Sequence, residues 1–124
     1  MNITKVKRPE CLEGYTIQQK TACGSLYLTM NELNDKLFEI RMTLGKSGSC
    51  YSIMFQTIAL LLSVMLQEGI SREKIRKTLE NQFEGNCGNA FWQDGVYYYS
   101  CIDFIVHKIL EDLASRGEIK LEAE

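Results

Sequence analysis

The longest uncharged run of this chain extends from Ser47 to Gln67. Ser49 has the side chain of a helix N-cap, and Gly69 stands where a C′ glycine is expected, so the residues between them are predicted to form one helix. A helix that is apolar on nearly all sides has to be covered on nearly all sides. A domain of 124 residues covers such a helix poorly by itself. We therefore expect a homo-oligomer, a dimer or a higher assembly such as a hexamer, in which a second subunit covers part of the helix.

The residues before this helix alternate between apolar and polar side chains, which is the period of a β-strand. Leu26, Leu28 and Met30 would share one face of a strand, and "KLFEIRMTL" alternates again directly downstream. Turn-forming residues at Asn31–Asp35 separate the two runs, which predicts a hairpin. Together with "YTIQQKT" upstream, positions 14–43 are predicted to form a β-meander.

Two more helices are predicted after the uncharged one. The first begins at Ser71, and the second begins at Ser100, whose hydroxyl can cap it. Asp103, three residues later, makes this start a short variant of the capping box, and Gly117 closes the helix. Positions 83–95, which lie between these two helices, are expected to be irregular.

These elements predict a single α+β domain at positions 14–117, in which a small antiparallel sheet packs with two or three helices. Positions 1–13 are expected to form an N-terminal arm, and positions 118–124 a short tail.

The composition excludes several classes of protein. The formal net charge is −2 and the isoelectric point about 5.5, so no global basic field would recruit DNA or RNA. No apolar run follows the basic N-terminus, so a signal peptide is not expected. The apolar centre "IALLLSVML" is too short to span a bilayer, so no membrane association is expected. Five cysteines without a CxxC pair fit a reducing compartment. We expect a cytoplasmic protein.

The start of the last predicted helix raises the question of a catalytic site. Asp103 and His107 are four residues apart and can meet on one helix face, whereas Cys101 lies on a different face. A thiol nucleophile needs its base within hydrogen-bond reach, so a capping carboxylate beside a histidine is the favoured interpretation. A thiol hydrolase that uses Cys101 and His107 is the enzymatic alternative. We expect no catalytic residues.

Metal binding by the cysteines has little support from spacing. Structural zinc sites take ligands in close pairs, but four of the five cysteines fall in four different elements: Cys23, Cys50, Cys87 and Cys101. A site distributed over these elements is the alternative. Buried free cysteine as a small apolar filler is the commoner outcome. We expect neither a metal nor another cofactor.

The segment "LGKSGS" before the uncharged helix is a candidate anion site. Its glycines free backbone N–H groups to converge, the following helix N-terminus adds partial positive charge, and Lys46 adds a full charge. The spacing is not that of a Walker A loop, so ATP hydrolysis is not implied. We assign Lys46, Gly48 and Ser49 to this site; a plain strand-to-helix turn is the alternative.

A second candidate site combines rings, side-chain amides and cations. Rings give a nucleobase a stacking surface, amides can read its edge, and cations can neutralise phosphates. The expected residues are Phe83, Asn86, Asn89, Phe91 and Trp92 in the segment before the last helix, with the cations Arg76, Lys108 and Arg116. The alternative is that Phe91 and Trp92 only fill the core beneath a loop.

Four motifs, in order along the chain, resemble the TSCPD domain family. They are "RPECLEG" at Arg8–Gly14, "CGSLYLTMN" at Cys23–Asn31, "LGKSGSC" at Leu44–Cys50 and "SCID" at Ser100–Asp103. The family has a comparable strand, a comparable turn into an apolar helix and a Ser-Cys-Pro-Asp helix start. Tyr99 and Ile102 stand where the family motif has threonine and proline.

TSCPD domains occur as accessory domains of cobalamin-dependent ribonucleotide reductases and as small stand-alone proteins. This chain is similar to the stand-alone type, and it resembles the phage Thoeris anti-defence proteins. That resemblance implies a non-enzymatic sponge, which sequesters a cyclic ADP-ribose isomer or a cyclic oligonucleotide in sites between subunits and so blocks TIR-based antiphage defence. The alternative, implied by the resemblance to TSCPD domains in general, is an accessory or regulatory domain linked to ribonucleotide reduction.

Overall fold

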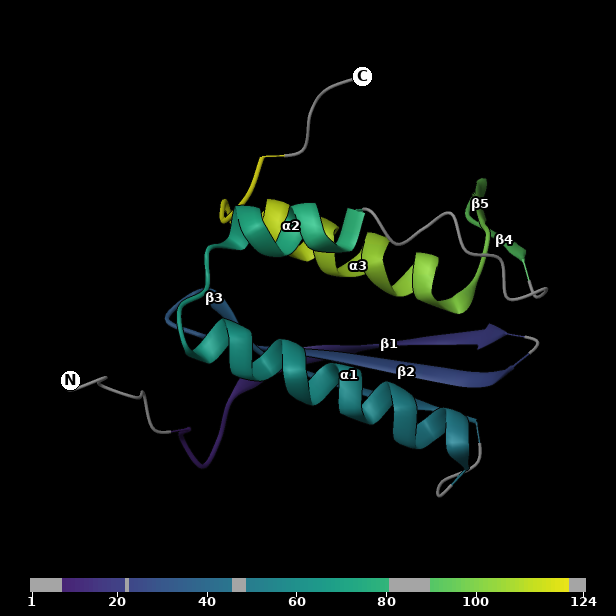
Figure 1. Ribbon diagram of the computed structural model, residues 1–124, viewed down its shortest axis with the longest axis horizontal. Helices are drawn as coiled ribbons and strands as arrows, with labels where there is room; N and C mark the ends of the chain where they lie inside the picture. Colours follow the sequence, from purple (N-terminus) through teal and green to yellow (C-terminus); the bar gives the residue numbers. More distant parts are fainter. Residues whose placement is uncertain (1–7, 22, 46–48, 81–89, 121–124) are drawn as a thin grey trace.

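The computed structural model describes residues 8–21, 23–45, 49–80 and 90–120. The chain forms a three-stranded antiparallel sheet in the order β1-β2-β3, followed by helices and a separate two-stranded sheet (Figure 1). The elements are β1 (Glu13–Thr21), β2 (Gly24–Leu33), β3 (Lys36–Leu44), α1 (Cys50–Gln67), α2 (Arg72–Glu80), β4 (Phe91–Gln93), β5 (Val96–Tyr98) and α3 (Cys101–Ser115). The predicted α+β class, with its N-terminal meander, is confirmed.

The turn between β2 and β3 is tighter than the sequence predicted. β2 continues to Leu33, which leaves only Asn34 and Asp35 in the loop. Both residues have positive φ angles, 53° and 65°. Two left-handed residues in succession make the hairpin turn whose twist matches that of the flanking strands.

The core lies on one face of this sheet. Leu26, Leu28 and Met30 share that face, as the alternation predicted, and each is at most 1% exposed. Their β3 partners are Leu44, Met42 and Ile40. α3 covers this face with Phe104, Ile109 and Leu113, which are also buried. The other face is largely polar.

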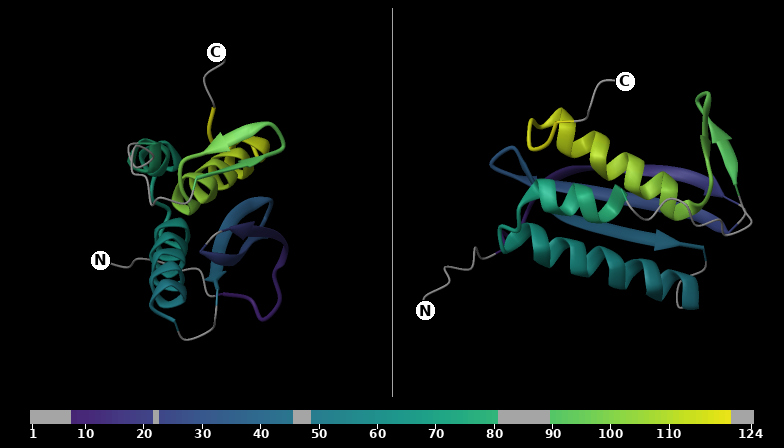
Figure 2. Two further views of the ribbon diagram at one scale, coloured as in Figure 1. Left: turned by 90° about the vertical axis from the view of Figure 1, so that its right-hand side faces the viewer. Right: turned by 45° about the horizontal axis from the view of Figure 1, so that its top comes forward.

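α1 does not lie flat on the sheet; it runs along the outer edge of β3 (Figure 2). The Ser63 hydroxyl accepts a hydrogen bond from the Ile40 N–H and lies within donor distance of the Ile40 carbonyl, both at 2.9 Å. Gln67 donates to the Phe38 carbonyl on the same edge at 3.4 Å. The helix therefore satisfies backbone groups that an edge strand would otherwise leave unpaired.

This placement leaves half of α1 uncovered. Ser49 caps the helix through the Ser52 N–H and Gly69 follows its end with φ 75°, as predicted. Only 33% of the helix is buried, and length and composition alone would allow it to cross a membrane. The expectation that the run is too short to span a bilayer considered only its apolar centre, "IALLLSVML", which is shorter than the whole helix. The exposed apolar face of α1 consists of Tyr51, Ile53, Met54, Ile58, Leu60, Leu61 and Val64.

The start of α3 is the predicted capping box. The Ser100 hydroxyl accepts from the Asp103 N–H at 3.0 Å, and the Asp103 carboxylate accepts from the Tyr99 N–H at 2.9 Å. Gly117, with φ 75°, follows the end of the helix, as predicted.

The expectation of an irregular segment at 83–95 is wrong for its last part, because β4 begins at Phe91 and pairs with β5. Asp94 and Gly95 both have positive φ and form the turn between these two strands. An Asp-Gly pair between aromatic residues is a hairpin signal that the sequence did contain.

Both flanking segments contact the domain within the described residues. Arg8, in the predicted arm, bonds Glu39 on β3. Glu118, in the predicted tail, accepts from the Leu37 N–H and from Arg72, and Ile119 is buried. These contacts extend the packed domain a few residues beyond the predicted 14–117 limits.

Candidate functional site

Three exposed rings form a continuous chain on the β4–β5 hairpin and its exit. Trp92 is 69% exposed, Tyr97 39% and Tyr99 53%. The Trp92 and Tyr97 ring centroids are 5.1 Å apart, and those of Tyr97 and Tyr99 are also 5.1 Å apart. We call these three residues the hairpin aromatics. Of the three, the sequence analysis identified only Trp92.

Phe91 points the other way, because successive residues of a strand face opposite sides. Its ring lies 5.5 Å from that of Tyr98 and 5.7 Å from that of Phe104. Tyr98 and Phe104 belong to the core. The two predicted roles, core packing and an exposed stacking surface, therefore fall to different residues: Phe91 packs on the core, whereas Trp92 is exposed to solvent.

Asp103 and His107 meet at the start of α3, next to this hairpin. His107 Nδ1 lies 2.8 Å from the Asp103 carbonyl oxygen and 3.1 Å from its carboxylate Oδ1. The His107 and Tyr98 rings are in edge contact at 5.3 Å. Cys101 is buried at 3% exposure, so its thiol faces the core. The favoured capping interpretation agrees with this geometry.

The predicted cations are each held by carboxylates of the same chain. Arg76 on α2 bonds both Glu73 and Glu80, and Glu73 is the main cause that raises the pKa of Arg76. Lys108 contacts Glu111 at 3.4 Å, and its ammonium lies 5.4 Å from the centre of the Phe104 ring.

Arg116 is the most enclosed of the three cations. It bonds Asp112 and Glu32, and the Asp112 hydrogen bond is the largest cause of its raised pKa. The Tyr15 hydroxyl donates to Asp112 as well. Burial first, and this bond second, raise the pKa of Tyr15. The group fastens α3 to β1 and β2.

The structure does not bring all of these residues to one place within one copy. β4, which contains Trp92, lies beside the N-terminal end of α3 (Figure 1), whereas Arg116 follows the C-terminal end of that helix. An α-helix of this length separates its ends by roughly 20 Å. Ser49 is an N-cap on α1. Five predicted ligand residues lie outside the described residues, and their assignment stays a prediction: Lys46, Gly48, Phe83, Asn86 and Asn89.

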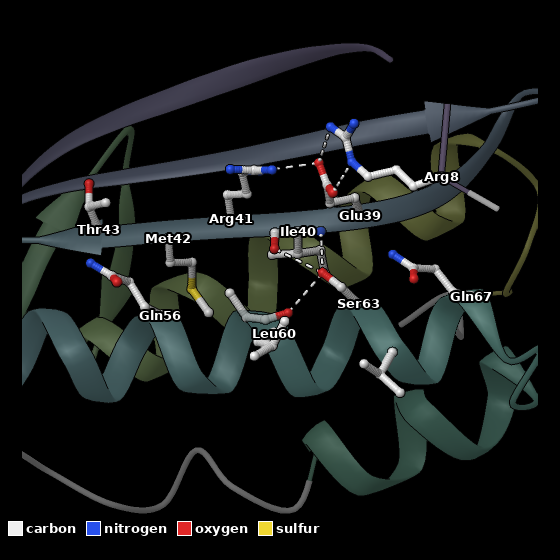
Figure 3. Close-up of a pocket in the computed structure, with 12 residues that line it drawn as sticks. Arg8, Glu39, Ile40, Arg41, Met42, Thr43, Gln56, Leu60, Ser63 and Gln67 are labelled. Carbon is white, nitrogen blue, oxygen red and sulfur yellow. Dashed lines mark hydrogen bonds and ion pairs between the residues drawn. The ribbon is translucent and has the colours of Figure 1, made fainter. Parts of the chain in front are cut away.

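A groove that the sequence analysis did not predict lies between β3 and α1, with a volume of about 660 Å³ (Figure 3). One wall carries Arg8, Glu39, Arg41 and Thr43, and the other carries Gln56 and Gln67 from α1. Ile40, Met42, Ala59, Leu60, Ser63 and Val64 complete the lining. We call it the β3–α1 groove. β3 and α1 are consecutive in the chain, but the groove depends on how the helix lies against the strand, so no local motif marks it.

Glu39 is the electrostatic centre of this groove. Its carboxylate accepts from Arg8 at 2.7 Å, from Asn31 at 2.9 Å and from Arg41 at 3.2 Å. These bonds, the one to Arg8 above all, lower the pKa of Glu39 to about 2. Glu39 is therefore ionised at neutral pH, although it is only 6% exposed.

No group of three or more His, Cys, Asp or Glu side chains suited to a metal ion occurs among the residues that the structure describes. Cys87 lies outside them. Whether the cysteines bind metal therefore stays open.

Two of the sequence motifs meet at a backbone contact. A Cβ on Gly24 would lie 2.7 Å from the Gly45 Cα, and Gly24 has φ +125°. The Gly45 N–H donates to the Ser25 carbonyl at 3.0 Å. Glycine is thus required at Gly24 for both space and backbone angle, and this ties the "CGSLYLTMN" strand to the "LGKSGSC" turn.

Comparison with known proteins gives one family. The model of the TSCPD domain matches residues 3–113, which is most of the chain. No curated protein and no solved structure matches this sequence. The matched range contains the glycine contact, α1 and the capped start of α3. The chain belongs to the TSCPD domain family.

Proposed function

We propose that this protein is a non-enzymatic, homo-oligomeric sponge for a cyclic nucleotide second messenger, such as a cyclic ADP-ribose isomer, and that it thereby blocks TIR-based antiphage defence. The observation that carries the proposal is the set of hairpin aromatics. Large exposed rings in mutual contact offer stacking surface to a nucleobase, and base–aromatic stacking is a strong, sequence-tolerant interaction. A free surface of this kind has no role in the core of the domain.

One cation near the hairpin, Lys108, could pair with an anionic ligand. Lys108 lies on the same helix as His107, and its ammonium is over the Phe104 ring, which itself contacts Phe91 of β4. Capture without cleavage needs no nucleophile, and the Cys101 thiol at this end of α3 is buried.

Oligomer formation is the second part of the proposal. The exposed apolar face of α1 carries no charge, whereas helices that lie on membranes usually carry Lys or Arg on their polar side. The polar side of α1 is instead bonded to β3 through Ser63, so the helix could not enter a bilayer without breaking that edge contact. A second copy of the chain presents a matching uncharged helix and suits the face better.

Isothermal titration of the wild-type oligomer with cyclic ADP-ribose isomers tests the proposal. We expect binding, and we expect Trp92→Ala to weaken it about tenfold or more, because one stacked ring is lost. Trp92→Phe, which keeps a ring, is the matched control and should stay near the wild-type affinity. Mass spectrometry of ligand released by heat should return it unchanged. A correctly folded oligomer that produces no binding heat would refute the sponge.

Membership of the TSCPD family also favours a second candidate, an accessory or regulatory domain linked to cobalamin-dependent ribonucleotide reduction. Elemental analysis of the purified protein separates the two proposals. Stoichiometric zinc would favour the accessory domain, with the cysteines as ligands. Zinc-free protein that binds a cyclic nucleotide would favour the sponge.

A further inference from the structure

The β3–α1 groove has the size and lining of a small-molecule site. Its volume of about 660 Å³ falls in the range of ligand pockets, which combine an apolar surface with a few directed polar groups. Met42 and Ala59 provide buried apolar surface, and Arg41, Gln56 and Gln67 provide the polar groups (Figure 3).

The groove is locally cationic in an acidic chain. Its lining contains two guanidinium groups and one carboxylate, hence one net positive charge, whereas the whole chain carries −2. Arg8 and Asn31 already donate hydrogen bonds to both oxygens of the Glu39 carboxylate. Arg41 contacts it through Nε alone, and its side chain is 66% exposed. Within the described residues, the two Nη atoms of Arg41 have no acceptor, so they can receive an anion.

The opposite wall adds neutral donors. The Gln56 amide nitrogen is 3.0 Å from the Ser52 hydroxyl, and the Gln67 amide nitrogen is 3.4 Å from the Phe38 carbonyl. Each amide has a second N–H that these contacts do not use. Thr43 contributes a hydroxyl on the side of Arg41. A phosphate group, with several acceptor oxygens, matches such a spread of donors better than a carboxylate, which one guanidinium can satisfy.

The groove is open where it meets the exposed apolar face of α1. Leu60 and Val64 line the groove and also belong to that face, at 64% and 45% exposure. A second copy packed on this face would stand over the open side of the groove. It would exclude water there and strengthen electrostatic contacts within.

We propose that the β3–α1 groove binds a small organic phosphate and that a second copy, packed on α1, completes the site. This inference rests on the association through α1 proposed above. It adds a site distinct from the hairpin aromatics, with Arg41 as the residue that binds the anion.

Isothermal titration with AMP as the probe tests the site. Wild-type protein should bind AMP, and Arg41→Gln should weaken binding about tenfold, because a charge-assisted hydrogen bond is lost. Lys20→Gln makes the same change of charge at an exposed position on β1 and should leave the affinity within about twofold. Equal losses in both variants, or no AMP binding by the wild type, would overturn the proposal.

Leu61→Lys tests the role of the second copy. Leu61 is 60% exposed and does not line the groove. The added charge should prevent packing on α1 and give a monomer that no longer retains AMP. Because the new charge is positive, it cannot weaken a phosphate site by repulsion. A monomer with full AMP affinity would overturn the two-copy site. Titration of Arg41→Gln with a cyclic ADP-ribose isomer keeps the sponge separate, since loss of AMP binding alone leaves that function standing.

Discussion

α1 and α3 pack on the same small sheet but differ in how much of each helix is buried. α3 lies over the core face and buries most of its length, including Asp103 and Asp112, whose carboxylates are hydrogen-bonded. α1 is the more apolar helix, with mean hydropathy 1.6, yet only 33% of it is buried. Apolar character alone therefore does not indicate how much of a helix is buried in its own domain. The buried side of α1 combines large apolar residues with small ones, and its Ser63 bonds the backbone edge of β3.

The largest expected effect on stability comes from a substitution in the buried face of α3. Phe104 is 1% exposed and contacts Phe91 and Tyr98. Phe104→Ala should lower the free energy of unfolding by about 4 kcal/mol, because a cavity remains in the core. Urea denaturation measures this. A loss below about 1 kcal/mol would mean that α3 is not the centre of the core.

Two adjacent leucines of α1 sharpen the comparison within one helix. Leu62 is 7% exposed and Leu61 is 60% exposed. Leu62→Ala should cost about 3 kcal/mol of unfolding free energy at every protein concentration. Leu61→Ala should instead reduce the concentration dependence of the melting temperature, because association stabilises the folded state by mass action. Calorimetry at two concentrations, with sedimentation to measure subunit number, distinguishes them. The same response from both variants would place both leucines in the core.

The contact between α1 and the edge of β3 can be tested by removing a single oxygen atom, that of the Ser63 hydroxyl. Ser63→Ala leaves the Ile40 N–H buried without its acceptor, so we expect a loss of about 2 kcal/mol in unfolding free energy. Ser115→Ala is the control, because Ser115 is exposed and its hydroxyl donates to the Asp112 carbonyl of its own helix. Hydrogen exchange at Ile40 should accelerate in the first variant and not in the second. Unchanged exchange would show that α1 does not protect this edge.

Acid provides the smallest and most local perturbation. The pKa of Glu39 is lowered to about 2 in the folded state from an ordinary value of 4.5. Its stabilisation is therefore complete above about pH 5 and is lost as the pH falls from there towards 2. Arg8 and Arg41 are partly exposed to water, so we expect a loss of only about 1 kcal/mol.

The comparison of wild type with Glu39→Gln isolates this loss, because other carboxylates titrate in both proteins. Urea denaturation at pH 5 and pH 3 should give a shallower pH dependence for the variant. Equal dependence in the two proteins would mean that Glu39 is not held ionised by its partners.

The strands and helix ends could be predicted because their signals are local. The alternation at Leu26–Met30 and the caps at Ser49 and Ser100 each depend on residues a few positions apart. The β4–β5 hairpin was missed although Asp94–Gly95 marks its turn, because three-residue strands carry too little periodicity.

The candidate sites were less predictable. Trp92 was identified by residue type, but Tyr97 and Tyr99 join it only through the geometry of a hairpin. Arg116 was predicted to neutralise a phosphate, and the structure shows it bonded to Glu32, which lies 84 residues away in the sequence. No sequence window could indicate such a pair.

The sequence was sufficient to predict most of the strands and helices, because these follow from residues that are near neighbours. Composition was sufficient to indicate that one helix carries too little charge to be exposed to water on all sides. The tertiary structure was needed to show that this helix presents Ser63 and Gln67 to the open edge of β3. It also decided which cations are already neutralised, and where a groove remains. The docking of α1, the groove and the Arg116–Glu32 pair depend on contacts between different elements, and local residue patterns do not encode such contacts.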